Sequence, residues 1–197
     1  MGADIIDTLV GIDPGSALDA IRNRRPQARE QAQASYAALF APEDLGGVTA
    51  AERFAVAAFI AGLHDDTRIA AFYSDRLAVT GASAVLHGAV DAAIAAAKGQ
   101  GPYGSYPAGP LSRENADGPT WRISVELRPA LGARLATAFE HMHLLVFHPR
   151  DAAPAALQEL LDAGWSTTDI VTLSQIAAFL SFQIRAVAGL CVLAGDS

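Results

Sequence analysis

Four polar side chains in the first half of the chain have the chemical types that acid/base catalysis uses. They are two carboxylates, an imidazole and a phenol: Glu52, Asp66, His64 and Tyr73. Asp66 and Tyr73 are seven positions apart and share a helix face. The helix dipole at Asp66 favours an ionised carboxylate. The four residues are therefore candidates for a proton-transfer site. In the alternative interpretation, Asp65 and Asp66 cap a helix, while Tyr73 packs in the core and makes one hydrogen bond.

A shared site requires the chain to turn back between these residues. Along one straight helix, Glu52 and Asp66 would lie ~21 Å apart. Gly62 is expected to end the first helix, because glycine is a common C-terminal stop. The four side chains can meet only if the helix breaks there.

A second group of titratable side chains begins at Glu140 and contains three histidines. Glu140 and His143 are three positions apart on one helix face, the Glu-x-x-His spacing of metal sites in helical bundles. Such sites need a second motif, and the sequence offers only a distant Glu52 or Glu159. Glu140 and His143 are therefore weak metal candidates, and no metal site is assigned. His143 is alternatively a core or pocket histidine, or a general base, since an unperturbed imidazole has a pKa of about 6.5.

Three further features have both a chemical and a structural interpretation. Cys191 has no base or cation next to it in the sequence, which favours a buried, inert thiol over a one-cysteine peroxidase. Arg185 lies in an apolar segment and needs a carboxylate partner, so an ion pair is favoured over a contact with a substrate anion. His148 and Asp151 are expected to end a helix with an ion pair.

Helices are predicted to position these residues. Capping boxes open two of them, at Thr49 to Glu52 and at Ser166 to Asp169. Caps, prolines and apolar spacing predict helices over 17–24, 26–40, 50–61, 66–80, 83–98, 131–146, 154–164 and from 167 onward. Alternation over 121–127 is a weak strand signal.

One all-α domain over residues 1–197 is the predicted fold. It consists of an N-terminal helical segment, the helices of the predicted site, a Gly/Pro-rich loop that could be a lid, and a C-terminal helical half: 1–42, 43–98, 99–119 and 120–197. The second capping box lies 117 residues after the first, and matching Ala and Arg positions follow both. The two halves of the chain could therefore be related by duplication, or their similarity could be accidental, and both interpretations are kept.

Composition excludes several classes of protein. The length of 197 residues suits one domain, and a net charge of −7 argues against a nucleic-acid partner. A single cysteine excludes an intrachain disulfide. The sequence contains no phosphate-binding loop and no dinucleotide fingerprint, so no cofactor is expected. The apolar window 176–194 carries Gln183 and Arg185 near its middle, which is unfavourable in lipid. The first residues do not resemble a signal peptide. We therefore expect a cytoplasmic protein with no membrane span.

Two segments carry a family resemblance. Residues 161–190 combine an Ala-Gly turn and a capped helix start with Gln175, Phe179 and Arg185 along the helix. Residues 49–73 place a glutamate near the start of a first helix. Both segments resemble the alkylhydroperoxidase D-like / carboxymuconolactone decarboxylase superfamily, in its peroxidase-related branch. The resemblance implies a helical bundle of that type and a homo-oligomer formed through apolar C-terminal helices.

The family pattern is a glutamate followed by Cys-x-x-Cys-x-x-x-His on the next helix. By this resemblance Glu52 takes the glutamate position, while Asp66 and Ile69 replace the cysteines and Tyr73 replaces the histidine. Thiol peroxidase chemistry needs an attacking thiolate and a resolving thiol, and these residues supply neither.

Three functions are therefore weighed. The first is an acid/base enzyme acting on a small organic molecule, for which the decarboxylase branch is a precedent by resemblance. Its catalytic residues would be Glu52, His64, Asp66 and Tyr73, with His143 from the other helix group. The second is a non-catalytic, oligomeric binding or assembly subunit. The third is residual peroxidase activity through the single cysteine.

Overall fold

The computed structural model describes residues 4–195, and within this range the secondary structure consists of helices, with no β-strand. The α-helices are α1 (Ile5–Val10), α2 (Ala17–Asn23), α3 (Pro26–Phe40), α4 (Ala50–Leu63), α5 (Thr67–Val79), α6 (Ala84–Ala97), α7 (Arg128–Phe147), α8 (Pro154–Asp162) and α9 (Thr167–Ala194). Two short 3-10 helices are η1 (Pro110–Glu114) and η2 (Pro149–Asp151). The predicted all-α fold class is confirmed.

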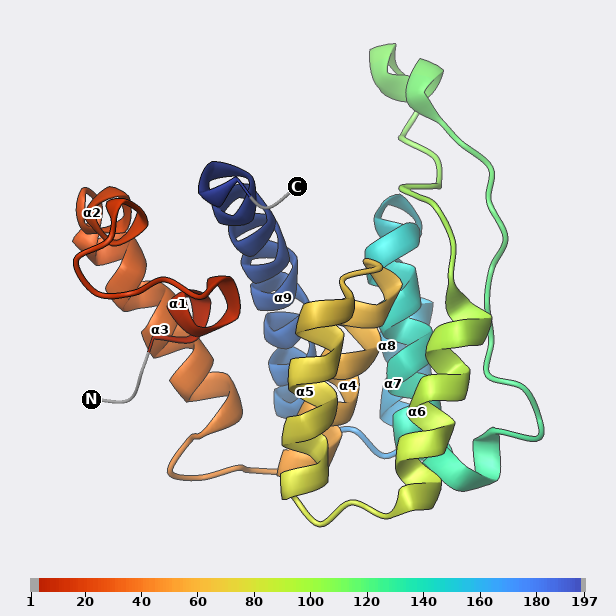
Figure 1. Cartoon of the computed structure of the whole chain (residues 1–197). Coiled ribbons are helices and arrows are strands. Elements are labelled where there is room, and N and C mark those ends of the chain that lie inside the picture. Colours follow the sequence, from red (N-terminus) through yellow and green to blue (C-terminus); the bar gives the residue numbers. More distant parts are fainter. Residues whose placement is uncertain (1–3, 196–197) are drawn as a thin grey trace.

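Helix α4 lies at the centre of the bundle because nearly all of its surface is apolar. Every residue from Arg53 to Leu63 is buried, and a helix that is apolar on all sides is typical of a core. It contacts α3, α5, α6, α7 and α9. Figure 1 shows α1, α2 and α3 gathered beside α9, away from α6, α7 and α8.

The chain turns after α4, but not at the residue that the sequence predicts. The helix continues through Gly62 to Leu63. A Cβ atom at position 62 would lie 2.5 Å from Cγ2 of Ile94, so glycine serves the close approach of α4 and α6. The helix is capped by His64, and Asp65 then adopts a left-handed conformation with a φ of 57°. The expected stop at Gly62 is wrong, although the break itself exists.

Both predicted capping boxes are present. The Thr49 hydroxyl accepts a hydrogen bond from the Glu52 amide, and the Glu52 carboxylate accepts one from the Thr49 amide. Ser166 and Asp169 form the same pair at the start of α9. Each box satisfies amides that a helix start leaves without partners. A common origin of the two helices stays a prediction.

Other boundaries differ in detail from the predictions. Helix α5 is capped by Asp66 rather than Asp65, and α1 has no counterpart among the predicted helices. Residues 121–127 form no strand. A single alternating segment has no neighbour with which to pair, and sheets need several strands to be stable. Here Ile123 is buried, while Arg122 turns to an ion pair with α7.

The predicted Gly/Pro-rich loop forms an arm, defined here as residues 99–119, that rises from the bundle (Figure 1). Its root is fixed to the end of α7, because the Tyr103 amide donates to the Phe147 carbonyl at 2.6 Å. The Arg150 guanidinium lies 4.4 Å from the centre of the Tyr106 ring. The arm is therefore held at its root, and a role as a lid stays a prediction.

A buried arginine holds the connection between α3 and α4. Arg53 is 5% exposed, and its guanidinium donates to the carbonyls of Leu39, Leu45 and Val48 at 2.7, 2.8 and 2.9 Å. Burial lowers the pKa of Arg53, while two nearby carboxylates oppose this shift. One side chain therefore satisfies one carbonyl in the last turn of α3 and two in the irregular segment that follows it.

Helix α9 is long and apolar enough to cross a membrane by length and composition, a property shared by core helices of soluble proteins. In this fold it contacts α1, α2, α3, α4, α7 and α8. Its outer face exposes four large apolar side chains: Val171, Phe182, Val192 and Leu193. Self-association through this helix stays a prediction.

Candidate active site

The structure does not gather the five predicted catalytic residues at one place. Glu52 lies at the start of α4, whereas His64 and Asp66 lie beyond its end, about 17 Å away along the helix axis. Tyr73 is in the core, and His143 belongs to a separate cavity beside α7. The break after α4 brings His64 and Asp66 together but leaves the others apart.

The contacts of the Glu52 carboxylate hold helices together. Besides closing its capping box, its carboxylate accepts a hydrogen bond from Arg134 Nε at 3.0 Å. Arg134 also donates to the Gly47 carbonyl, and its guanidinium lies 3.8 Å from the centre of the Trp165 ring. The carboxylate therefore joins α4 to α7 and to the start of α9.

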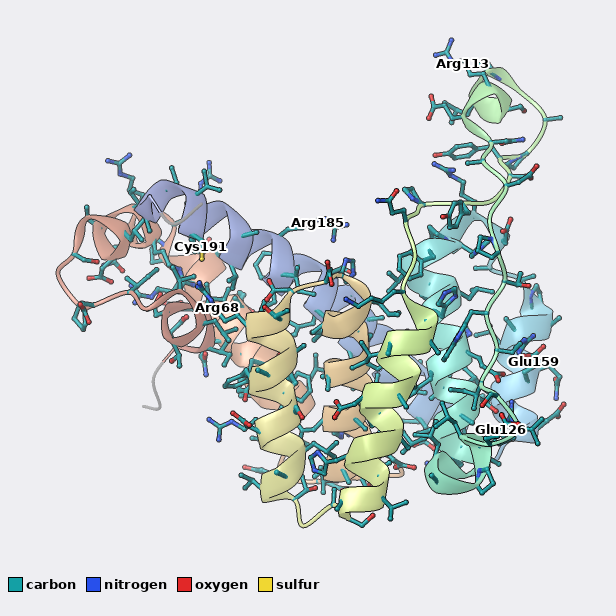
Figure 2. All side chains as sticks on the ribbon, turned by 45° about the vertical axis from the view of Figure 1, so that its right-hand side comes forward. Arg68, Arg113, Glu126, Glu159, Arg185 and Cys191 are labelled. Carbon is teal, nitrogen blue, oxygen red and sulfur yellow. The ribbon has the colours of Figure 1, made fainter. Side chains whose placement is uncertain are left out.

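His64 and Asp66 form a small polar group at the turn. Asp66 accepts a hydrogen bond from the Ile69 amide at 2.8 Å, as an N-cap does. Burial lowers the pKa of His64, the positive charge of Arg185 lowers it further, and Asp66 opposes both. Arg185 itself is exposed (Figure 2) and donates to the Ser181 carbonyl. Among residues 4–195 it has no ion pair, so the expected carboxylate partner is not found.

Tyr73 matches the packing interpretation. It has no exposed surface, and its hydroxyl donates to Oε1 of Gln183 on α9 at 2.8 Å. Its ring packs against Phe40, Phe54 and Phe72. Burial raises the pKa of Tyr73 well above its ordinary value. A phenol in this position is neutral and has no route to a bound substrate.

Cys191 has a cationic neighbour that the sequence does not place beside it. Arg68 Nη1 lies 3.1 Å from the Cys191 sulfur, and Figure 2 shows the two side chains next to each other. The thiol is partly buried in a shallow crevice that Asp66 also lines. No second cysteine exists to resolve an oxidised thiol, so a peroxidase cycle would need an external thiol.

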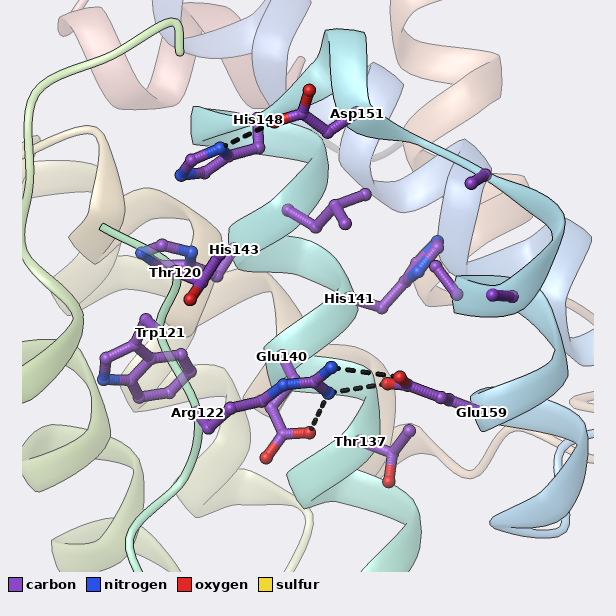
Figure 3. A pocket seen from close by; sticks show the side chains of 14 residues that line it. Thr120, Trp121, Arg122, Thr137, Glu140, His141, His143, His148, Asp151 and Glu159 are labelled. Carbon is purple, nitrogen blue, oxygen red and sulfur yellow. Dashed lines mark hydrogen bonds and ion pairs between the residues drawn. The ribbon is translucent and has the colours of Figure 1, made fainter. Parts of the chain in front are cut away.

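The histidines of α7 line a cavity of about 240 Å³. Its walls are α7, α8, η2 and the segment that leads from the arm into α7 (Figure 3). The lining contains hydroxyl, imidazole, carboxylate, guanidinium and apolar groups: Thr120, Trp121, Arg122, Thr137, Glu140, His141, His143, Leu144, His148, Asp151, Ala153, Ala155, Ala156 and Glu159. Four further pockets elsewhere on the described residues have no imidazole in their linings.

Three histidines of the described residues have a buried ring nitrogen without a hydrogen-bond partner, and of these His64, His87 and His141 only His141 lines the cavity. It is 7% exposed, and its buried Nδ1 has no hydrogen-bond partner among the described residues. Burial lowers the pKa of His141, and the negative charge of Glu159 opposes the shift. The ring is therefore neutral near pH 7, and a neutral imidazole is able to accept a proton.

His143 forms part of the apolar wall. It is 6% exposed, with ring centres 5.3 Å from Trp121 and 4.9 Å from Phe147. Burial is the main cause that lowers the pKa of His143 to about 4, and the nearby His148 lowers it further. His143 is thus neutral over the physiological range and shapes the cavity.

His148 is fully engaged by two acceptors. Its Nδ1 lies 3.0 Å from the Asp151 carboxylate and its Nε2 lies 3.0 Å from the Pro119 carbonyl. Both contacts are hydrogen bonds only when both nitrogens carry a proton. The hydrogen bond from His148 is the largest cause that lowers the pKa of Asp151. His148 and Asp151 are thus in contact at this helix end, and the contact of His148 with Pro119 also ties the arm to α7.

Glu140 has no free coordination capacity for a metal ion. Its carboxylate accepts hydrogen bonds from Arg122 at 2.9 Å, from the Ile123 amide at 3.0 Å and from Arg128. Among residues 4–195, no three His, Cys, Asp or Glu side chains are arranged so that they could hold one metal ion together. Glu140 therefore belongs to an ion-pair network with Arg122 and Arg128. His143, three residues later, lies in the cavity wall.

Acidification is expected to destabilise the protein through His143. In the unfolded chain this imidazole binds a proton below its ordinary pKa of about 6.5, whereas the folded chain resists protonation until about pH 4. The unfolded state therefore binds more protons in this window, and stability is lost as the pH falls. From about pH 7.5 to about pH 4.5 the expected loss is about 2 kcal/mol.

Urea denaturation at several pH values measures this loss as the free energy of unfolding. His143→Phe keeps an aromatic ring between Trp121 and Phe147 and should show a smaller loss than the wild type. His87→Phe, on α6 outside the cavity, makes the same chemical change and is the variant with which His143→Phe is compared. Equal slopes for wild type and His143→Phe would contradict the assignment.

Sequence reasoning missed the groups that complete the cavity. The cluster of histidines from position 141 to 148 is visible in the sequence, but its partners come from distant segments. Arg122 reaches α7 from the end of the arm, and Glu159 reaches it from α8. The one sequence signal that points to this place is the Gly/Pro-rich loop 99–119, because a long loop of this kind is often a binding segment.

Comparison of the chain with protein-family models, with curated proteins and with solved structures finds no match. The resemblance to the alkylhydroperoxidase D-like superfamily therefore depends on residues 49–73 and 161–190 alone and stays a prediction.

Proposed function

We propose that the protein is an acid/base enzyme acting on a small organic molecule, and that the reaction takes place in the α7 cavity. The single observation that supports this is His141, a buried imidazole with an unpartnered Nδ1 in the cavity wall. Buried polar groups in native proteins are normally hydrogen-bonded. An exception beside a cavity suggests a partner supplied by a ligand.

The surrounding groups suit proton transfer. A neutral His141 accepts a proton from the bound molecule, and the fixed guanidinium of Arg122 stabilises the negative charge that develops. Trp121 and Leu144 supply the apolar surface that is typical of small-molecule sites. The cavity volume limits the ligand to a small organic molecule.

This site differs in position from the one that the family resemblance implies. The resemblance places the chemistry on α4 and α5, where Glu52 and Tyr73 are held in structural contacts. Acid/base chemistry has a precedent in the decarboxylase branch of that superfamily, by resemblance only. The proposal keeps the type of chemistry and places it on α7.

A turnover screen of small unsaturated lactones and organic acids tests the proposal. With an active compound, His141→Ala should lower kcat/KM by about 10²–10⁴-fold, the usual contribution of a general base. Asp66→Ala, which removes the carboxylate at the α5 start, and His87→Ala, on α6, should leave the rate unchanged. Full activity in His141→Ala would exclude His141 as the base, and a loss confined to Asp66→Ala would place the site at α5.

A further inference from the structure

Glu159 closes one side of the cavity by pairing with Arg122. Its two carboxylate oxygens accept hydrogen bonds from the two terminal nitrogens of the guanidinium, at 2.6 and 3.0 Å. Figure 3 shows this pair spanning from the segment before α7 to α8, in front of the α7 helix. A two-point contact of this kind is how arginine recognises planar carboxylates.

The two carboxylates that bind Arg122 differ in how firmly they are held. The Glu140 side chain is 6% exposed and is fixed by further hydrogen bonds from Arg128 and from the Ile123 amide. The Glu159 side chain is 47% exposed, and all of its described ion pairing is with Arg122. Exposed ion pairs contribute little to stability because water screens them. Glu159 is therefore replaceable at Arg122, whereas Glu140 keeps the guanidinium in place.

Charge balance favours a single negative charge in the place of Glu159. In the structure, the two positive charges of Arg122 and Arg128 are balanced by the two negative charges of Glu140 and Glu159. When Glu159 turns away, the group has one uncompensated positive charge. A ligand with one carboxylate restores the balance, whereas a neutral ligand does not.

We infer that Glu159 occupies the subsite of a ligand carboxylate, and that the α7 cavity takes small organic monocarboxylates that displace Glu159 from Arg122. The ligand carboxylate lies on the guanidinium, and the rest of the molecule lies between Trp121 and the unpartnered ring of His141. This inference rests on the proposed function for the role of His141 in chemistry, but not for carboxylate binding itself.

Calorimetric titration with benzoate, and with benzamide as its uncharged counterpart, tests the inference. Glu159→Gln removes the competing charge and should bind benzoate about 10-fold more tightly than the wild type, while its affinity for benzamide changes little. Asp162→Asn is the matched control, because it removes one exposed carboxylate from the same helix outside the cavity. It should leave both affinities unchanged.

Arg122→Met should lower benzoate affinity at least 10-fold, and Arg122→Lys should recover only part of it, because an ammonium group makes no two-point contact. Thermal unfolding of each variant verifies that it is folded. If Glu159→Gln binds no benzoate, or tightens benzamide and benzoate equally, the inference is overturned. In His141→Ala, turnover of an active compound should fall far more than benzoate affinity, because the Arg122 guanidinium still binds the carboxylate. These two measurements separate the fate of the proposed reaction from that of this subsite.

Discussion

Replacing Arg53 by methionine is expected to lower the free energy of unfolding by about 4 kcal/mol. The substitution keeps a long apolar side chain but leaves the carbonyls of Leu39, Leu45 and Val48 without their shared donor. A buried acceptor without a partner costs about 1–3 kcal/mol. Three such penalties give about 3–9 kcal/mol. The expected loss lies near the lower end of this range because the end of α3 and the segment after it can relax toward water.

Urea denaturation followed by circular dichroism measures this change. Arg113→Met, at the exposed tip of the arm (Figure 2), makes the same chemical change and should alter stability by less than about 0.5 kcal/mol. A loss below about 1 kcal/mol in Arg53→Met would mean that water or another donor replaces the guanidinium.

Tyr73→Phe is expected to cost about 3 kcal/mol, the upper end for a broken buried hydrogen bond. Gln183 has no exposed surface, and its Nε2 already lacks a partner among the described residues. Loss of the Tyr73 hydroxyl leaves the whole amide unpaired in the core. The packing of the ring against its aromatic neighbours is unchanged.

A double-mutant cycle separates this hydrogen bond from general core damage. Gln183→Leu alone should also be destabilising, because it leaves the Tyr73 hydroxyl unpaired. The double variant Tyr73→Phe with Gln183→Leu has no unpaired polar group at this place and should be more stable than the sum of the single effects predicts, by about 1–2 kcal/mol. Strictly additive losses would show that the two groups do not interact.

Local sequence signals predicted the helices well because the interactions that start a helix are local. Ser16, Thr49 and Ser166 each satisfy amides within three residues of themselves, so the pattern is complete in the sequence. Gly62 misled the prediction because its role depends on Ile94, a residue of another helix. The strand signal after Trp121 failed for the same kind of reason, since pairing depends on a partner strand.

The cavity could be predicted only in part. The histidines that line the cavity are visible as a cluster in the sequence, but the site also needs Arg122 and Glu159, which come from other elements. Asp66 and Tyr73 are expected from their spacing to share a helix face, but Asp66 caps α5 from outside the helix and Tyr73 is buried against α9. Spacing in the sequence shows which side of a helix a residue occupies. It does not show which other helix packs against that side.

The arm divides into a root with little steric freedom and a tip with much. A Cβ atom at Gly104 would lie 2.7 Å from an Asp151 oxygen, and one at Gly118 would lie 2.1 Å from the Tyr103 ring. The tip at 110–114 meets the bundle through a backbone atom, because the Glu114 carbonyl accepts a hydrogen bond from Arg150 at 3.2 Å. Over evolutionary time the tip is thus free to lengthen, shorten or acquire a new sequence, whereas those two glycines tolerate no exchange unless η2 or the aromatic ring moves with them.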